Sequence, residues 1–317
     1  MNKLVVIALG GNAIKQAHEC GTSDEQFVNV ETTCHELIKM NRLGYKIVIT
    51  HGNGPQAGNL LIQQEESKKL LPPQPLNIVG AMTQGQIGFM FQNTLRNFFH
   101  LAGKEVPVVT VVTQVLVDEN DPDFADPSKP IGPFYTEQEA RVLREQKNYL
   151  IKKVKPNGTK IWRRVVPSPE PQMIVEAGSI KSLLEARNIV IAAGGGGVPV
   201  RLISDGTYQS LEAVIDKDKA GNILAQAVNA DIFLILTDVE KASLNWGLEN
   251  EKPLDKITVE QAEKYLAEGH FLKGSMGPKM TAAIRFVKAG GEKAVITSLS
   301  RATDALAGNT GTIITRD

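Results

Sequence analysis

The fold is decided by the stretch Lys3-Leu4-Val5-Val6-Ile7-Ala8-Leu9-Gly10-Gly11-Asn12-Ala13, in which the apolar run 4–9 is followed directly by a pair of glycines. An apolar run without polar alternation is typical of a strand that is buried on both faces of a parallel sheet. Glycine at the end of the strand lets the backbone approach an anion closely, because no Cβ stands in the way. The stretch therefore predicts an α/β fold whose sheet presents bare backbone N–H groups at its carboxyl edge.

Two further stretches repeat this pattern. The stretch 46–49, apolar from Ile47 onward, is followed by Thr50-His51-Gly52-Asn53-Gly54-Pro55. The stretch 188–192, apolar from Ile189 onward, is followed by Ala193 and the glycine run 194–197. We expect a helix behind each turn, and a helix N-terminus adds partial positive charge. Three such turns on one sheet predict a site that grips several oxyanions, most simply a chain of phosphates.

Length and charge narrow the class of protein. The chain has 317 residues, which is enough for one large α/β unit or two domains with substantial cores. It carries 35 Lys plus Arg against 35 Asp plus Glu, so its formal net charge is zero. A balanced charge gives no support for a polyanion-binding surface, and we expect no nucleic-acid partner.

The cysteines and the apolar runs indicate in which cellular compartment the protein is expected. Cys20 and Cys34 are the two cysteines, and their spacing fits neither a redox pair nor a metal site. Two unpaired thiols fit a reducing cytoplasm. The N-terminal residues lack a basic leader with a cleavage site, and no apolar run approaches the roughly 18 residues of a membrane span. We expect a cytoplasmic protein without a membrane partner.

Strand-like and helix-like segments alternate along the chain, which favours a mainly parallel sheet. A capping box is expected at Ser23 with Gln26, and Pro278 is expected at the first position of a helix. Helices are expected over 23–43, 79–101, 178–187, 218–230, 258–268, 278–289 and 300–307, and strands over 106–117, 231–237, 294–297 and 311–314.

The segment of about residues 118–166 differs from the rest of the chain in composition. Residues 118–133 are rich in Asp, Asn, Pro and Gly and are predicted to form a loop, and Pro156-Asn157-Gly158 is typical of a hairpin between 149–154 and 159–166. A polar loop and a hairpin inserted between sheet strands predict a protruding lid. A mobile lid that carries Lys129 is one way to close a phosphoryl-transfer site, and a surface excursion without function is the alternative.

Three known nucleotide motifs are missing: the P-loop, the full Gly-x-Gly-x-x-Gly spacing and the protein-kinase signatures. The positive candidates are residues 216–218 (Asp-Lys-Asp), the turn Gly274-Ser275-Met276-Gly277-Pro278-Lys279 and residues 236–239 at a strand end. A carboxylate that fixes a neighbouring ammonium can neutralise a phosphoryl group in transfer. A solvated helix cap at Asp216 or Asp218, and an exposed loop lysine at Lys279, remain alternatives. His51 is interpreted as a packing residue, with acid–base chemistry as the alternative.

These residues carry a resemblance to the carbamate kinases, a branch of the amino acid kinase family. Five stretches match, from the N-terminal region to the last quarter of the chain, so the resemblance covers essentially its whole length. Residues 6–9 contain no lysine, whereas relatives that phosphorylate amino-acid carboxylates commonly have one there. The matching stretches are residues 8–13, 50–56, 193–197, 214–218 and 274–279.

The resemblance implies an open αβα sandwich with a protruding subdomain. It implies an acceptor half at 1–200, which contains the lid at about 118–166, and a nucleotide half at 201–317. It also implies reversible phosphoryl transfer between carbamoyl phosphate plus ADP and carbamate plus ATP, with Mg²⁺ held mainly by the phosphates. The same resemblance implies a homodimer and a place in arginine or agmatine breakdown.

The candidate site residues rest on the resemblance together with the chemistry of the side chains. Catalysis is then positioning and charge neutralisation, because a carboxylate oxygen already attacks well. The catalytic candidates are Lys129, Lys217, Asp218 and Lys279. The candidates for binding the carbamate or carbamoyl phosphate are Gly10, Gly11, Asn12, Gly52, Asn53 and Gly54. The candidates for binding the nucleotide are Gly195, Gly196, Asp216, Thr237, Asp238, Met276 and Gly277.

Two other functions fit this pattern. One is an enzyme of the same fold that acts on a different small carboxylate or phosphate, which the lysine-free first strand disfavours. The other is a catalytically silent nucleotide sensor, which would need to have lost its lysines, whereas Lys217 and Lys279 are both present.

Overall fold

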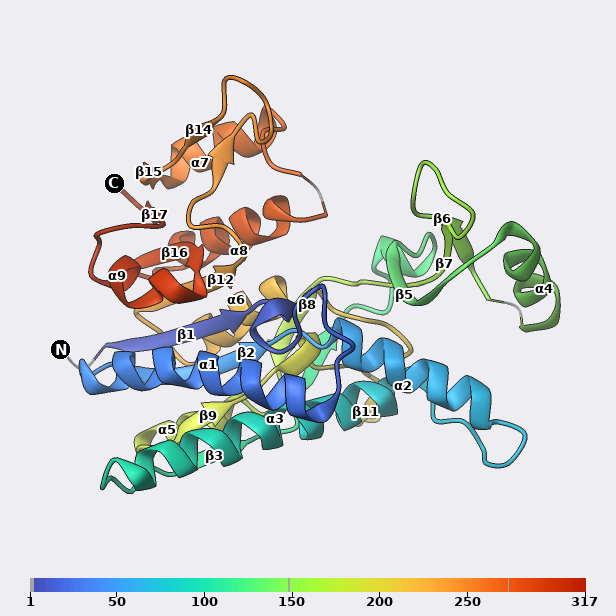
Figure 1. The fold of residues 1–317 in the computed structure, drawn as a ribbon, viewed down its shortest axis with the longest axis horizontal. Coiled ribbons are helices and arrows are strands. Elements are labelled where there is room, and N and C mark those ends of the chain that lie inside the picture. The colour runs from blue at the N-terminus through green and yellow to red at the C-terminus, as the bar shows by residue number, and fades with distance from the viewer. Residues whose placement is uncertain (1–2, 148, 273) are drawn as a thin grey trace.

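The molecule is built on a central sheet flanked by helices, as a computed structural model shows (Figure 1). The structure describes residues 3–147, 149–272 and 274–317. Within these residues the central sheet has eight strands in the order β15-β17-β16-β12-β1-β2-β9-β3. The β16–β17 pair is antiparallel and the other pairs are parallel. The predicted α/β class with a mainly parallel sheet is confirmed. The strands of this sheet are β1 (Leu4–Leu9), β2 (Lys46–His51), β3 (Val108–Thr110), β9 (Ile189–Ile191), β12 (Ile232–Thr237), β15 (Lys256–Thr258), β16 (Lys293–Ser298) and β17 (Thr312–Thr315).

Both faces of the central strands are buried, as the continuous apolar runs predict. In β1, Val5 and Ile7 belong to one hydrophobic cluster, whereas Val6 and Ala8 belong to another on the opposite face. Helices α1, α3 and α9 contribute to the first cluster, and α5, α6, α7 and α8 to the second. The result is a three-layer αβα sandwich. The helices are α1 (Ser23–Arg42), α2 (Gly54–Ser67), α3 (Leu76–Leu101), α4 (Glu137–Lys147), α5 (Ala177–Glu185), α6 (Lys217–Ala227), α7 (Val259–Ala267), α8 (Met276–Lys288) and α9 (Ala302–Leu306).

Smaller sheets surround this body. A four-stranded sheet has the order β11-β10-β4-β8, and β13 pairs with β14. A three-stranded antiparallel sheet, β5-β7-β6, projects from the body together with α4 (Figure 1). The antiparallel pairing of β6 with β7 confirms the predicted hairpin. These strands are β4 (Gln114–Val117), β5 (Lys129–Tyr135), β6 (Ile151–Lys153), β7 (Trp162–Val166), β8 (Pro171–Ile174), β10 (Val198–Leu202), β11 (Tyr208–Ser210), β13 (Ser243–Leu244) and β14 (Lys252–Pro253).

The expected single strand over 106–117 is wrong. The chain forms β3 and β4, which join different sheets, and Thr113 lies between them. Gln84 of α3 accepts from the backbone N–H of Thr113 and donates to its carbonyl oxygen. A side chain thus takes the backbone N–H of Thr113, while the carbonyl oxygen of Thr113 also accepts from the backbone N–H of Val198 at the start of β10. The chain therefore leaves the central sheet here and continues in the sheet of β10.

Several local expectations are also corrected. Residues 129–133 are not loop but belong to β5. The capping box of α1 is formed by Thr22 with Glu25, because the helix begins one residue after Thr22. Pro278 is the third residue of α8 instead of the first, since that helix begins at Met276. No helix among the described residues is long and apolar enough to cross a membrane.

Candidate active site

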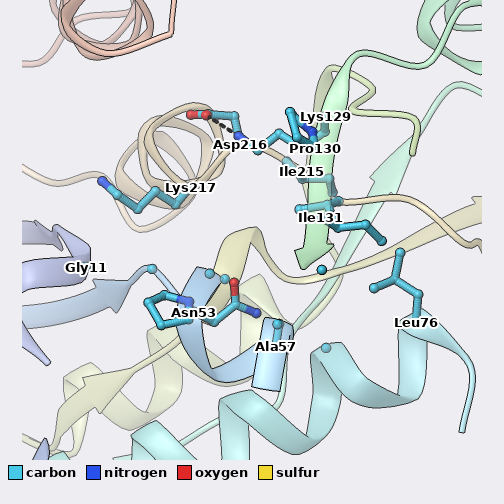
Figure 2. A pocket seen from close by; sticks show the side chains of 18 of the residues that line it. Gly11, Asn53, Ala57, Leu76, Lys129, Pro130, Ile131, Ile215, Asp216 and Lys217 are labelled. Atoms are coloured by element: carbon cyan, nitrogen blue, oxygen red, sulfur yellow. Dashed lines mark hydrogen bonds and ion pairs between the residues drawn. The ribbon is translucent and has the colours of Figure 1, made fainter. Parts of the chain in front are cut away.

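The three glycine turns meet beside the N-terminus of α6, around a cleft of about 630 Å³. A Cβ placed on Gly52 would lie 3.8 Å from the backbone nitrogen of Gly11 and 3.3 Å from Cδ of Lys217. The first two turns and α6 therefore approach one another closely. In Figure 2, Gly11 and Asn53 lie on one side of the cleft, and Asp216, Lys129 and Ile131 lie on the other.

Each turn leads into a different kind of element. Residues 54–67 form α2 directly behind the second turn, as expected. The first turn leads instead into the short 3₁₀ segment Gly11–Ala13, and the third leads through Gly194–Gly196 into strand β10. The expectation of a helix N-terminus behind every turn is therefore wrong for the first and third turns. Only the second turn therefore has a helix N-terminus directly behind it, that of α2, whose dipole adds partial positive charge there.

The third turn uses glycine because of its backbone conformation. Gly195, Gly196 and Gly197 have φ values of +66°, +95° and +80°, a region that favours glycine. A Cβ on Gly196 would lie 2.2 Å from the carbonyl oxygen of Ile215. The third turn thus packs against Ile215, which directly precedes residues 216–218 at the start of α6. By contrast, a Cβ on Gly11 or Gly54 would meet nothing within 4 Å, so these two glycines leave open space.

The centre of the site is a buried carboxylate between two lysines. Asp218 is 2% exposed. Its Oδ1 lies 2.5 Å from Nζ of Lys217, and its Oδ2 lies 3.2 Å from Nζ of Lys279. The lysine side chains retain 18% and 14% of their exposure and line the cleft. One carboxylate therefore fixes two ammonium groups, which come from the N-terminal turns of α6 and α8, at the cleft wall.

The hydrogen bonds of Asp216 show which of the two acids, Asp216 or Asp218, caps α6. Its Oδ1 accepts from the backbone N–H of Asp218 at 3.0 Å and of Lys219 at 3.4 Å, so Asp216 is the N-cap. Its Oδ2 lies 3.1 Å from Nζ of Lys129, which reaches over from β5. Burial opposes ionisation of Asp216, but the Lys129 and Lys217 ammonium groups and the backbone N–H outweigh it and lower its pKa. Asp218 is left free for the lysines.

Other predicted site residues lie around the first turn and β12. Nδ2 of Asn12 donates to Oδ1 of Asp238 at 2.7 Å, which ties the first turn to the end of β12. A Cβ on Gly10 would lie 3.1 Å from the carbonyl oxygen of Leu236 in the same strand. Of the predicted residues, those that line the cleft are Gly11, Gly52, Asn53, Gly54, Lys129, Gly195, Asp216, Lys217, Asp218 and Lys279. Those outside its lining are Gly10, Asn12, Gly196, Thr237, Asp238, Met276 and Gly277.

His51 is part of the packing behind the second turn. It is fully buried, and burial lowers its pKa to about 4 despite the hydrogen bond to the carbonyl oxygen of Gly52. Nδ1 is 2.9 Å from that oxygen, so Nδ1 carries the proton and donates. A Cβ on Gly194 would lie 2.4 Å from Nε2 of His51. The neutral ring thus stands directly beneath the third turn, as the packing interpretation predicted.

Sequence reasoning missed several polar residues near the cleft, of which Arg163 and Thr83 hold neighbouring groups in place. Arg163 of β7 lines it and donates to the carbonyl oxygen of Gly132 at 2.8 and 3.1 Å. Thr83 of α3 is fully buried and accepts from Nδ2 of Asn53 at 2.9 Å. Neither residue lies in a glycine turn or a recognisable motif, so only the three-dimensional arrangement reveals them.

Comparison with known proteins places this arrangement in a family. The model of the amino acid kinase family matches residues 3–298. The carbamate kinase of Pyrococcus furiosus is 51% identical over 314 residues, which cover 98% of this chain and 99% of that protein. The carbamate kinase of Giardia lamblia bound to AMP-PNP has a TM-score of 0.93 and 44% identity, and the match covers 100% of this chain and 99% of that one. N-acetylglutamate synthase from Neisseria gonorrhoeae shares the fold at 13% identity, with a TM-score of 0.56 over 99% of this chain and 62% of that one. The chain therefore belongs to the amino acid kinase family and, within it, to the carbamate kinases.

Proposed function

We propose that this protein is an ATP:carbamate phosphotransferase that interconverts carbamoyl phosphate plus ADP with carbamate plus ATP. The observation that carries the proposal is the buried Asp218 carboxylate, which holds the ammonium groups of Lys217 and Lys279 at the cleft wall. A catalytically silent nucleotide sensor would not need two ammonium groups fixed by one buried carboxylate. The membership of the carbamate kinases supports the choice of substrate.

The charged side chains and the glycine turns have separate tasks. Lys217 and Lys279 neutralise negative charge on the phosphoryl group in transfer, and Asp218 keeps both ammonium groups in place. Backbone N–H groups of the first two turns hold the carboxylate oxygens of the acceptor, except that of Gly52, which donates to the carbonyl oxygen of Leu9. Lys129 reaches the same cleft from the lid (about residues 118–166) and adds a further positive charge. The carbamate oxygen attacks without help from a base, so catalysis rests on alignment.

We place the nucleotide beside α6, α8 and the end of β12, where Asp216, Thr237, Asp238, Met276 and Gly277 lie. Gly196 packs against the carbonyl oxygen of Ile215, just before Asp216. We therefore place Gly196 with these nucleotide-binding residues. Gly195 packs against the side chain of Asn53, which is one of the residues proposed to bind the acceptor. This contact supports a position for Gly195 on the acceptor side of the cleft. The division into an acceptor half at 1–200 and a nucleotide half at 201–317 is part of this proposal.

Mg²⁺ fits a site of this kind. The described residues contain no group of three or more His, Cys, Asp or Glu side chains that could hold a metal ion, and both oxygens of Asp218 face lysines. Mg²⁺ commonly binds through substrate phosphates and water with few protein ligands. When bound to the nucleotide phosphates, it would supply further neutralisation of their charge.

A homodimer and a cytoplasmic location complete the proposal. Ile78, Met82 and Phe89 follow one another at helical spacing on α3 and are 42%, 41% and 59% exposed. Val28 of α1 is 61% exposed, and its neighbour Phe27 makes an edge contact with Phe89. We call these four exposed residues, Val28, Ile78, Met82 and Phe89, the α1–α3 patch. Exposed apolar side chains gathered on two helices that pack against each other support an interface with a second copy. The free thiols Cys20 and Cys34 suit a reducing compartment.

A coupled assay tests the activity. Purified protein is given ADP, Mg²⁺ and carbamoyl phosphate, and ATP formation is followed beside reactions with acetyl phosphate and with a panel of amino-acid acceptors plus ATP. We expect rapid ATP formation from carbamoyl phosphate. A folded protein that binds ADP and forms no ATP above background would contradict the proposal.

A further inference from the structure

The side chain of Asn53 does not cap the helix that it precedes. Asparagine at an N-cap usually accepts a hydrogen bond from the first turn. Asn53 is the N-cap of α2, yet its side chain makes no such bond. Its Nδ2 instead donates to Oγ1 of Thr83 on α3 at 2.9 Å. The amide is therefore held in place by a neighbouring helix and is available for a purpose other than capping.

The Thr83 hydroxyl determines which way this amide faces. A hydroxyl has one proton, and that of Thr83 is donated to the carbonyl oxygen of Gly80 at 2.7 Å. Its oxygen can then only accept from Asn53, so the NH₂ end of the amide is turned toward α3. The other end, Oδ1, is turned away from α3 toward the cleft that Asn53 lines. Figure 2 shows this oxygen directed into the space below Lys217 and Ile131.

Gly195 of the third turn also packs against this amide. A Cβ on Gly195 would lie 2.2 Å from Nδ2 and 2.8 Å from Oδ1 of Asn53. The amide thus packs against bare backbone of the third turn, whose φ of +66° itself favours glycine. Contacts with two separate elements leave the amide little freedom to rotate, so the cleft is presented with a fixed hydrogen-bond acceptor.

We propose that Oδ1 of Asn53 is the specificity-determining acceptor for the NH₂ group of carbamate and carbamoyl phosphate, and that Thr83 is the positioning residue that sets its orientation. This inference rests on the proposed function. The backbone N–H groups of the turns and the Lys217 ammonium are donors, which suit carboxylate and phosphate oxygens. The NH₂ group requires an acceptor instead. Acetyl phosphate has a methyl group of similar size at this position and leaves Oδ1 unpaired, which costs transition-state binding.

The test measures discrimination between two phosphoryl donors. We determine kcat/KM for ATP formation from carbamoyl phosphate and from acetyl phosphate at saturating ADP, and take the ratio of the two values. Thr83→Val removes the hydroxyl at nearly constant volume and should lower this ratio roughly tenfold, through a loss with carbamoyl phosphate. Thr83→Ser keeps the hydroxyl and should keep the ratio. Thr94→Val, which alters another buried threonine of α3 outside the cleft lining, is the matched control.

A double variant separates positioning from general damage. Asn53→Ala should lower the ratio at least as far as Thr83→Val, and Thr83→Val should then change the ratio no further in the Asn53→Ala background. An unchanged ratio in Thr83→Val, or an equal further loss in the double variant, overturns the inference while ATP formation by the wild type leaves the proposed function standing. If Thr83→Val does not fold, Thr83→Ala takes its place in both comparisons. A folded wild type that forms no ATP from carbamoyl phosphate overturns the function itself.

Discussion

At the scale of single residues, the chemistry rests on a few charged side chains with distinct tasks. Asp216 and Asp218 are two positions apart, yet one caps α6 and the other holds two lysines. The sequence left a cap at either position open. The geometry assigns the cap to Asp216. A substitution of Asp218 therefore tests the ion pairs with Lys217 and Lys279 without removing the helix cap.

Asp218→Asn should lower kcat by roughly 10²–10³-fold with little change in the KM for ADP, because fixed charge in a water-poor site acts mainly on the transition state. Steady-state kinetics of ATP formation measures both constants. Asp24→Asn is the matched control, since Asp24 is the second residue of α1 as Asp218 is of α6, but it is exposed. A kcat within a few-fold of the wild type would remove Asp218 from the catalytic machinery.

His51 should make stability depend on pH. Burial lowers its pKa to about 4 in the folded protein, against about 6.5 in an unfolded chain. The unfolded state therefore binds more protons between these values, and stability rises with pH through this window. The contribution is complete above pH 6.5 and is lost as pH falls toward 4, by about 3 kcal/mol.

Urea unfolding at a series of pH values measures this slope. The slope between pH 6.5 and 4 should shrink in His51→Gln, which has no group that titrates there. The exposed His35 offers the control, because His35→Gln should leave the slope as it is. An equal slope in wild type and His51→Gln would mean that other groups account for the acid sensitivity.

At the scale of elements, the three glycine turns look alike in sequence but have different structural reasons for glycine. Gly11 has open space where a Cβ would stand, and its φ is not positive. Gly196 has a φ of +95° and contacts the backbone of Ile215. The first glycine keeps room for a ligand, whereas the second lets two parts of the backbone pack.

The two glycines should therefore respond differently to the same substitution. Gly11→Val should fold with a melting temperature near that of the wild type and lose turnover, because the side chain occupies the space of the anion. Gly196→Val should be strongly destabilised, because the new side chain meets main-chain atoms in a strained conformation. Thermal unfolding and the coupled assay on both variants give the comparison. A Gly11→Val enzyme with wild-type kcat/KM would exclude the first turn from substrate binding.

At the scale of the whole molecule, patterns along the chain predicted the mainly parallel sheet and the glycine turns that follow its strands, and contacts between distant segments decided the rest. Continuous apolar runs such as 4–9 identified the central strands, because burial on both faces requires apolar residues throughout. The break at Thr113 depends on Gln84, 29 residues away in sequence. The orientation of Asn53 depends on Thr83 and Gly195. Such side-chain contacts leave no periodic signal in a sequence.

The α1–α3 patch leads to the last prediction, which concerns assembly. If it forms the interface of a dimer related by twofold symmetry, each substitution acts twice, once on each side. Phe89 is 59% exposed and stands where α1 and α3 meet. Phe89→Glu would place two carboxylates in an apolar contact and should shift the protein to a monomer.

Light scattering coupled to size exclusion, at several protein concentrations, measures the mass in solution. We expect about twice the chain mass of 34.4 kDa for the wild type and the single-chain mass for Phe89→Glu. Leu248→Glu is the control, because Leu248 is 63% exposed but lies in the loop between β13 and β14. A wild-type protein that elutes as a monomer would contradict the dimer. A dimer that survives Phe89→Glu would place the interface on another face, since an apolar contact cannot bury two new charges without a partner for either.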